Sequence, residues 1–424
     1  MALVEMVQEV FAPGGVLARA DTHFQPREGQ TQMAMAVAHT IETGGALVVE
    51  AGTGVGKTFS YLVPALLSGE RVLLSTATKA LQDQLFARDL PRLAQTLGLP
   101  VRMALLKGRA SYLCLYRMEL ARQDVSAREP GVARVLAKVE SWSHGTRSGD
   151  LAELTGLDER SPVIPLVTST RENCLGSQCP RFRECHVHLA RREALAADIV
   201  VINHHLFFAD VAVRESGMAE LLPSVRVVVF DEAHQINETG VQFLGLTLST
   251  GQLMDFGRDL LAAGLQHARG LADWTGLASQ VDLSARDLRL AAGDMRGSAK
   301  LRWTDETPES VRPDEWQTAL RRVSLACAQA QEALDTVSEI APDFVRLYER
   351  GTELLARLAH FSGPGNPDAV RWVDLYDLAA EVRRNPGEFT PWVRIYMTEH
   401  LDRIFGAIAA LTLFIEKRRH GSLE

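Results

Sequence analysis

The sequence predicts an α/β fold built on a parallel sheet, followed by a largely helical region. Short β-branched runs alternate with helical periods from Phe24 to about Arg109, and similar runs return at Asp198 to Ile202 and at Val225 to Phe230. These runs are continuous, as expected for strands that are buried on both faces of a sheet. From about Glu238 to Phe361, apolar residues recur every three or four positions, which is the period of an amphipathic helix.

Composition indicates an ordinary globular chain. Its 424 residues are 46% hydrophobic, and the formal net charge is −8 at pH 7. The acidic balance means that any contact with nucleic acid must come from local basic patches. No apolar run reaches the roughly 18 residues of a membrane span, and no N-terminal segment has the pattern of a secretion signal. We therefore expect a cytoplasmic protein without a membrane partner.

A glycine-rich loop lies between the first expected strand, Ala46 to Glu50, and a helix that extends through Leu67; a further strand is expected at Val72 to Ser75. A phosphate-binding loop requires this order, because backbone N–H groups and the helix N-terminus then face phosphate oxygens. Lys57 would contact the β- and γ-phosphates, and the Thr58 hydroxyl would join the shell of a bound Mg²⁺ ion. The predicted nucleotide ligands are Ala51, Gly52, Thr53, Gly54, Val55, Gly56, Lys57 and Thr58.

An acidic pair follows the apolar run that ends at Phe230, in the sequence Asp231-Glu232-Ala233-His234. By itself such a pair could be a solvated turn, but ligands of open α/β sheets gather where strands end. Together with the glycine-rich loop, the pair predicts nucleotide hydrolysis. Asp231 would hold the metal ion, directly or through water, and Glu232 would position and polarise the attacking water. The predicted catalytic residues are Lys57, Asp231 and Glu232.

Residues 110 to about 194 interrupt the α/β pattern and contain four of the five cysteines. Four thiolates from one loop-rich insertion fit a Cys₄ site, which is either an iron–sulfur cluster or zinc; unligated thiols are the third possibility. The loose spacing favours iron–sulfur, because zinc ribbons usually use two close pairs. His186 and His188 lie nearby, but four cysteines already complete such a site, so both are predicted to be surface residues. The cysteines are Cys114, Cys174, Cys179 and Cys185.

The fifth cysteine, Cys327, lies on an apolar stripe of helical spacing and is predicted to be a core thiol. A second apolar stretch, Ile404 to Ile415, is followed by three basic residues. It is too short to span a bilayer, and we expect a helix that packs on the core or on a partner. The stripe consists of Trp316, Leu320, Val323, Cys327, Ala330, Leu334 and Val337.

Together these motifs resemble the XPD/DinG family of superfamily 2 DNA helicases, and most of all its bacterial YoaA branch. The resemblance implies that Arg27 and Gln30 contact the adenine of ATP and that the four cysteines hold a [4Fe–4S] cluster. It rests on the segments Phe24 to Met33, Glu50 to Thr58, Ser75 to Leu85, Lys107 to Arg109, Tyr112 to Cys114, Asn173 to Gly176, Asn203 to Leu206 and Asp231 to His234.

The resemblance also implies a domain order. It comprises a RecA-like motor domain at 1–109 and 195–237, an iron–sulfur insertion at 110–194, a helical arch at 238–371 and an unassigned tail at 372–424. Single-stranded or forked DNA would pass beside the cluster and under the arch, moved 5′ to 3′ by ATP hydrolysis in DNA repair or replication, with a repair or replication protein as a partner. The candidate DNA contacts are Arg109, Arg181, Arg183 and Arg191, with Tyr112 stacking on bases.

One departure from the family is large. The Ser-Ala-Thr motif and the second RecA-like domain, with its Gln-x-x-Gly-Arg-x-x-Arg helix, are not found in this sequence. We therefore expect an incomplete motor that has the ATP-binding and DNA-binding parts only. Two other classes remain open: a nucleotide- and DNA-binding module that needs a partner, and a redox-responsive DNA-binding protein.

Overall fold

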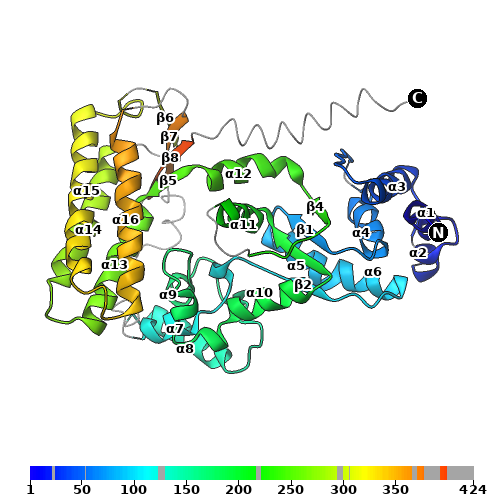
Figure 1. Cartoon of the computed structure of the whole chain (residues 1–424), viewed down its shortest axis with the longest axis horizontal. Helices are drawn as coiled ribbons and strands as arrows, with labels where there is room; N and C mark the ends of the chain where they lie inside the picture. The colour runs from blue at the N-terminus through cyan, green and yellow to red at the C-terminus, as the bar shows by residue number, and fades with distance from the viewer. Residues whose placement is uncertain are drawn as a thin grey trace. The chain divides into compact units, whose positions relative to one another are not determined.

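The computed structural model describes residues 1–21, 24–52, 54–122, 129–215, 221–293, 299–304, 306–364, 370–376 and 392–398. The chain folds into two compact units, whose elements are labelled in Figure 1. The sheet unit holds residues 1–108 and 187–243, and the helical unit holds residues 109–186 and 244–401. Among the described residues, no helix is both long enough and apolar enough to cross a membrane.

The sheet unit contains a four-stranded parallel sheet, which confirms the predicted α/β class. The strand order is β2-β3-β1-β4, so β1 and β3 are central. Their residues are almost entirely buried, as their continuous β-branched runs predict. Ser75 in β1 pairs in register with Ile202 on one side and with Phe230 on the other. The strands are β1 (Val72–Thr76), β2 (Met103–Leu105), β3 (Ile199–Asn203) and β4 (Val227–Phe230).

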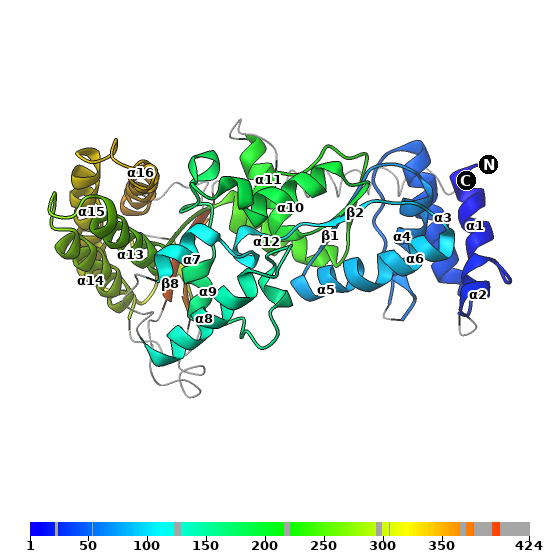
Figure 2. The same cartoon turned by 90° about the horizontal axis from the view of Figure 1, so that it is seen from below.

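Helices pack around this sheet. α3 and α4 lie against each other and against α1, and α6 packs beside α4 (Figure 2). Their apolar faces join β1 and β3 in one core, in which Phe11, Leu62 and Leu74 are buried. The helices are α1 (Leu3–Phe11), α2 (Val16–Ala20), α3 (Glu28–Thr43), α4 (Lys57–Leu67), α5 (Lys79–Gln84), α6 (Leu90–Leu97), α10 (His186–Ala196), α11 (His204–Glu215) and α12 (Ile236–Leu244), with a π-helical turn at Leu85–Asp89.

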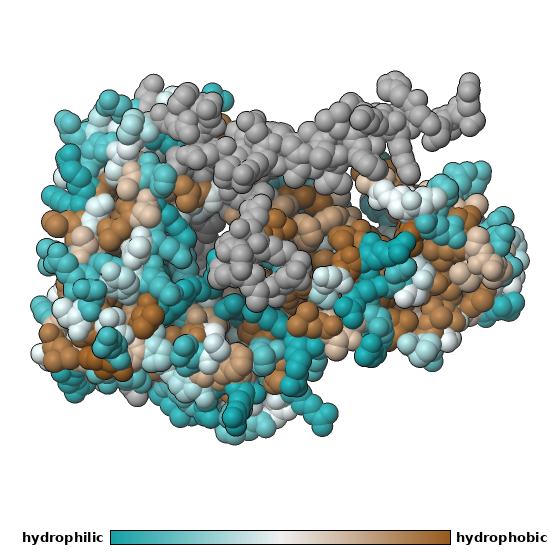
Figure 3. Space-filling model, viewed as in Figure 1, coloured by the Kyte–Doolittle hydropathy of each residue, from teal (hydrophilic) through white to brown (hydrophobic). Residues whose placement is uncertain are grey.

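Two strand predictions in this unit need correction. The segment 46–50 is not a strand, because it pairs with no strand of the described residues, and Val48 is 59% exposed. Strand β4 forms, but it is not buried on both faces. It is the last strand of the described sheet, with a neighbour on one side only, and Val228 is therefore 41% exposed. Apolar surface on this unit is visible in Figure 3.

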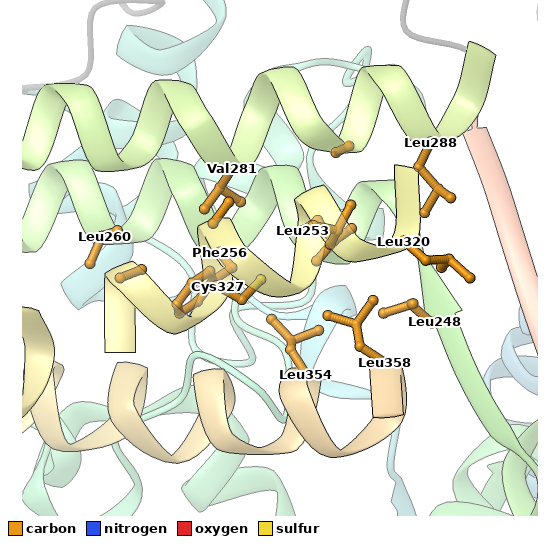
Figure 4. Close-up of a cluster of buried hydrophobic side chains, with 14 of the residues drawn as sticks. Leu248, Leu253, Phe256, Leu260, Val281, Leu288, Leu320, Cys327, Leu354 and Leu358 are labelled. Atoms are coloured by element: carbon orange, nitrogen blue, oxygen red, sulfur yellow. The ribbon is translucent and has the colours of Figure 1, made fainter. Parts of the chain in front are cut away.

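Four long helices form the core of the helical unit. Each packs against the next in sequence, and the fourth also packs against the first. Cys327 is fully buried beside Phe256 (Figure 4), which confirms its prediction as a core thiol. Trp316 and Phe361 lie in the same core. The helices are α13 (Thr250–His267), α14 (Trp274–Ala291), α15 (Pro313–Asp335) and α16 (Pro342–Ser362).

An antiparallel sheet accompanies these helices, in the order β5-β8-β7-β6. The sequence predicted none of its strands. β5 and β6 lie in the region with a helical pattern, and most of β7 and all of β8 come from the segment 372–424, which stayed unassigned. The apolar stretch Ile404 to Ile415 lies outside the described residues. The strands are β5 (Leu246–Ser249), β6 (Ala299–Trp303), β7 (Val370–Tyr376) and β8 (Trp392–Thr398).

The cysteine-bearing region, residues 109–186, belongs to the helical unit and has a small core of its own around Leu113, Val139 and Val163. As predicted, none of its described residues forms a named strand. Short helices and 3₁₀ turns connect its loops instead. They are α7 (Leu115–Ala121), α8 (Pro130–Ser143) and α9 (Val163–Val167), with 3₁₀ turns at Arg109–Ser111, Leu151–Glu153, Gly176–Gln178 and Phe182–Glu184.

Candidate functional site

The glycine-rich loop leads directly into α4, whose first residue is Lys57. Gly54 and Gly56 have φ values of 81° and 92°, which glycine adopts without strain. A side chain at Gly56 would also overlap the amide of Gln30. The position therefore requires glycine for two independent reasons. Thr53, one of the predicted nucleotide ligands, lies outside the described residues.

Gln30 lies under this loop. It is 5% exposed, and its Nε2 donates a hydrogen bond to the carbonyl of Gly56 at 3.2 Å. Its own carbonyl accepts a hydrogen bond from Ser60 Oγ at 3.1 Å. Gln30 therefore fastens α3 to the loop, a supporting role that its motif does not indicate. Arg27 is exposed at the start of α3, with its guanidinium near Gly54, and the predicted adenine contacts of both residues stay predictions.

The acidic pair lies where β4 ends. The Asp231 N–H donates to the carbonyl of Ser75 at 2.8 Å and so continues the ladder beyond the strand. Glu232 has φ 57° and ψ 44°, a left-handed conformation that is uncommon for a residue other than glycine and is frequent at functional sites. This turn directs Glu232 toward α4, where its Oε1 lies 3.8 Å from Nζ of Lys57. The structure thus brings the two predicted motifs together.

Negative charge is crowded at this edge of the sheet. Burial raises the pKa of Asp231, the neighbouring Glu232 raises it further, and Lys57 opposes both effects. The pKa of Tyr61 in α4 is also raised, first by burial and then by the charge of Asp231. A carboxylate that is partly desolvated and lies near a second carboxylate favours a cation. Asp231 and the Thr58 hydroxyl offer the hard oxygen ligands that Mg²⁺ prefers.

A second predicted segment, Ser75 to Leu85, has the expected geometry. β1 ends at Thr76, and α5 begins at Lys79. Thr78 caps this helix, since its Oγ1 accepts a hydrogen bond from the Leu81 N–H at 3.2 Å. Its hydroxyl and the first N–H groups of α5 thus lie at the same edge of the sheet as the acidic pair. Such groups suit contacts with phosphates of a nucleic-acid backbone.

The four cysteines of the insertion influence one another. Burial raises the pKa of Cys114 to about 11, and Cys179 and Cys174 add to the effect. Burial also raises the pKa of Cys179, with further contributions from Cys174 and Cys185. The thiols therefore lie within electrostatic range of one another. Among the described residues, however, no three His, Cys, Asp or Glu side chains are arranged to hold a metal ion.

Two expectations around the cysteines are wrong. His186 is not a surface residue but is 8% exposed, because its ring packs on Gly149, where a Cβ would overlap it. Tyr112 is 4% exposed and its backbone bridges to Asp150, so its ring is not available to stack on bases. Of the candidate arginines, Arg183 is exposed, whereas Arg181 forms ion pairs with Glu119 and Glu184. Arg109 and Arg191 are partly exposed.

A buried ion network, which no sequence motif indicates, joins the cysteine-bearing region to α13 and α16. Asp259 accepts from Arg117 at 2.8 Å and from Arg350 at 2.9 Å. Arg350 also pairs with Glu172 at 3.4 Å, and its side chain is 4% exposed. Arg117 lies just beyond Cys114, and Glu172 just before Cys174. The network therefore fastens the segments next to Cys114 and Cys174 to the long helices.

Comparison with known proteins matches the same segments. Residues 30–134 match the DEAD/DEAH box helicase family, and residues 153–253 match the family described as DEAD_2. The chain is 45% identical to the ATP-dependent DNA helicase YoaA of Escherichia coli (strain K12) over 305 residues, which cover 71% of this chain and 48% of that protein. It is 41% identical to YoaA of Haemophilus influenzae over 340 residues, 79% of this chain and 50% of that one.

A further relative is the ATP-dependent helicase DinG of Mycobacterium tuberculosis (strain ATCC 25177 / H37Ra), at 42% identity over 249 residues, 53% of this chain and 37% of that protein. The chain thus spans about half the length, or less, of these curated relatives. The matches identify it as a partial-length homologue of the XPD/DinG-type helicases YoaA and DinG, with DEAD/DEAH box and DEAD_2 domains.

Proposed function

We propose that this polypeptide is the first motor domain of an ATP-dependent DNA helicase and binds Mg·ATP between the glycine-rich loop and the acidic pair. One observation supports this most directly: Lys57 Nζ lies 3.8 Å from Glu232 Oε1, although the two residues come from motifs far apart in the sequence. Both motifs meet at the carboxyl edge of a parallel sheet, where nucleotides bind in this class of fold.

The side chains divide the chemistry as follows. Lys57 exchanges Glu232 for the β- and γ-phosphates, while the backbone N–H groups from Ala51 to Gly56 surround the phosphate oxygens. Thr58 and Asp231 would hold Mg²⁺, which would neutralise phosphate charge. Glu232, released from Lys57, orients the attacking water. Gln30 and Arg27 contact the adenine.

Nucleotide binding can be tested with two substitutions that separate affinity from chemistry. Lys57→Ala removes a charged contact with phosphate and should lower the affinity for a fluorescent Mg·ATP analogue by roughly 100-fold. Glu232→Gln should not lower the affinity, because Glu232 acts on water and releases Lys57 when the nucleotide binds. Lys79→Ala is the matched control, since it removes an exposed lysine from the start of another helix of the same unit. Equal affinity for wild type and Lys57→Ala would contradict the proposal.

The DNA substrate of the whole protein belongs to the same proposal. Single-stranded or forked DNA, 5′-to-3′ movement and a role in repair or replication are supported by the relatives, whose names describe ATP-dependent DNA helicases. In this chain, the exposed Arg183 and the end of β1 with its Thr78 cap provide groups that contact backbone phosphates. A repair or replication protein is the proposed partner.

We also propose that Cys114, Cys174, Cys179 and Cys185 hold a [4Fe–4S] cluster. The proposal is supported by the effect of these thiols on one another's pKa, since Cys174 and Cys179 act on Cys114, and Cys174 and Cys185 act on Cys179. The cluster would stabilise the surrounding loops and supply no step of ATP hydrolysis. These residues define the proposed iron–sulfur insertion, and α13 to α16 form the proposed arch.

The cluster has a direct test. Protein purified without oxygen should be brown and contain iron, whereas colourless protein with stoichiometric zinc would refute the assignment. Cys179→Ser should release the iron and loosen the insertion, while the sheet unit stays folded and still binds Mg·ATP, because a metal site contributes folding energy only where it binds. Cys327→Ala is the matched control, since this thiol lies in the helical core and should leave the iron content unchanged.

A further inference from the structure

A buried polar pair lies at the edge of the sheet that carries the proposed ATP site. Ser75 Oγ and His204 Nδ1 are 2.7 Å apart, and the two residues are 1% and 0% exposed. Ser75 belongs to β1, and His204 is the first residue of α11, directly after β3. In the site described above, neither of these two side chains has a role, and Ser75 contributes only its backbone carbonyl.

The same pair contacts the acidic motif. The carbonyl of Ser75 accepts the Asp231 N–H at 2.8 Å, and the ring of His204 lies 5.9 Å from that of Phe230, the residue before Asp231. Burial lowers the pKa of His204, and the backbone of Asp231 and Glu232 opposes this effect. The second ring nitrogen, Nε2, is buried and has no hydrogen-bond partner among the described residues. Its ring therefore lies between Ser75 and the backbone of the acidic pair.

On its other side, Ser75 leads into the segment proposed to contact DNA. Thr76 Oγ1 donates to the carbonyl of Thr78 at 3.1 Å, and Thr78 caps α5. A displacement of Ser75 along β1 would consequently move both the cap of α5 and the carbonyl that accepts the hydrogen bond from the Asp231 N–H. One buried contact thus connects the proposed nucleotide site to the proposed DNA-binding edge.

A buried hydroxyl and imidazole could simply satisfy each other, as buried polar groups generally do. Two features are not explained by mutual hydrogen bonding alone. The strained φ of Glu232 persists only if the surrounding groups fix it, and the residue before it, Asp231, is held through its N–H by the carbonyl of Ser75. In addition, Nε2 of His204 is buried and has no hydrogen-bond partner in the described part of the chain, a cost that an apolar residue at this position would avoid.

We infer that His204 is a positioning residue that, with Ser75, couples the nucleotide state at Asp231 and Glu232 to DNA binding at the end of β1 and the start of α5. The inference rests on the proposed function. It concerns how the two sites communicate and not whether either ligand binds.

The test is the linkage between the two ligands in the 424-residue chain. Affinity for a fluorescently labelled oligo(dT) strand is measured with and without a non-hydrolysable Mg·ATP analogue. Wild type should show an affinity ratio of about fivefold or more. His204→Asn retains an atom that can bond Ser75 but lacks the rest of the ring, and should bring the ratio close to one. Ser75→Ala should do the same, and each variant should keep its separate affinities within about twofold of wild type.

His205→Asn is the matched control, because the next histidine is exposed and contacts Phe243 edge-on at 5.7 Å. It should keep the wild-type ratio. If His204 only supports the fold, His204→Asn will lower the melting temperature and leave the ratio unchanged, which overturns the inference. A wild-type chain that binds both ligands independently overturns it as well. A wild-type chain that fails to bind Mg·ATP refutes the proposed function instead.

Discussion

A polypeptide of these 424 residues should bind Mg·ATP and hydrolyse it roughly 10³ to 10⁵ times more slowly than a full-length relative. In the transition state, charge on the γ-phosphoryl oxygens meets Lys57 and Mg²⁺. By the resemblance, a second-domain helix Gln-x-x-Gly-Arg-x-x-Arg supplies further arginines in full-length relatives, and a polypeptide of only these 424 residues does not contain that motif. The lost stabilisation corresponds to about 4–7 kcal/mol.

Single-turnover hydrolysis with saturating single-stranded DNA measures this difference, with a full-length YoaA relative as the reference. Glu232→Gln should reduce the small remaining rate only slightly, because the main stabilising charge is already lacking. Fast hydrolysis by the 424-residue chain that Glu232→Gln abolishes would contradict the prediction. That result would require an arginine of this chain to complete the ATP site, and it would exclude the alternative of a nucleotide- and DNA-binding module without motor activity.

The sequence predicted those parts of the site that depend on local pattern. β1 and β3 are central strands with continuous β-branched runs, and they form within one residue of the predicted bounds. The glycine-rich loop and the acidic pair each follow from a short motif whose backbone requirements are local. The two motifs lie close together, with Lys57 beside Glu232, because the carboxyl ends of parallel strands lie at a common edge of the sheet.

Long-range partners account for most of what the sequence did not predict. Residues 46–50 have the composition of a strand, but a strand also needs a neighbour with free backbone groups, and no described strand pairs with them. β6 and β7 pair across the whole length of α15 and α16, so neither run could be recognised from its own residues. Pattern also does not show which polar side chains become buried, and His186, His204 and Gln30 are the examples here.

The ion network around Asp259 is the feature most remote from any motif, and its removal should have the largest effect on stability. Asp259→Ala removes the carboxylate that Arg117 and Arg350 share and leaves Arg350 with Glu172 alone, which should cost about 3–5 kcal/mol of unfolding free energy. Tryptophan fluorescence in a urea titration reports the unfolding of the helical unit selectively, because all six tryptophans lie in that unit. Asp282→Ala, which breaks an exposed pair with Arg286 on α14, is the control and should cost under about 1 kcal/mol.

The same network predicts how the helical unit responds to acid. Burial alone would raise the pKa of Asp259, but Arg117 and Arg350 outweigh it, and the pKa is lowered in the folded state. A carboxyl whose pKa is lower when folded stabilises the protein above its unfolded pKa of about 3.9, and this stability is lost as the pH falls further, through the folded pKa. Wild type should therefore lose stability below about pH 4, while Asp259→Asn, already less stable at pH 7, should lose less over the same range. The free energy of unfolding of both proteins is measured as a function of pH. If it falls equally in both, Asp259 is not the group whose charge holds the cysteine-bearing region to α13 and α16.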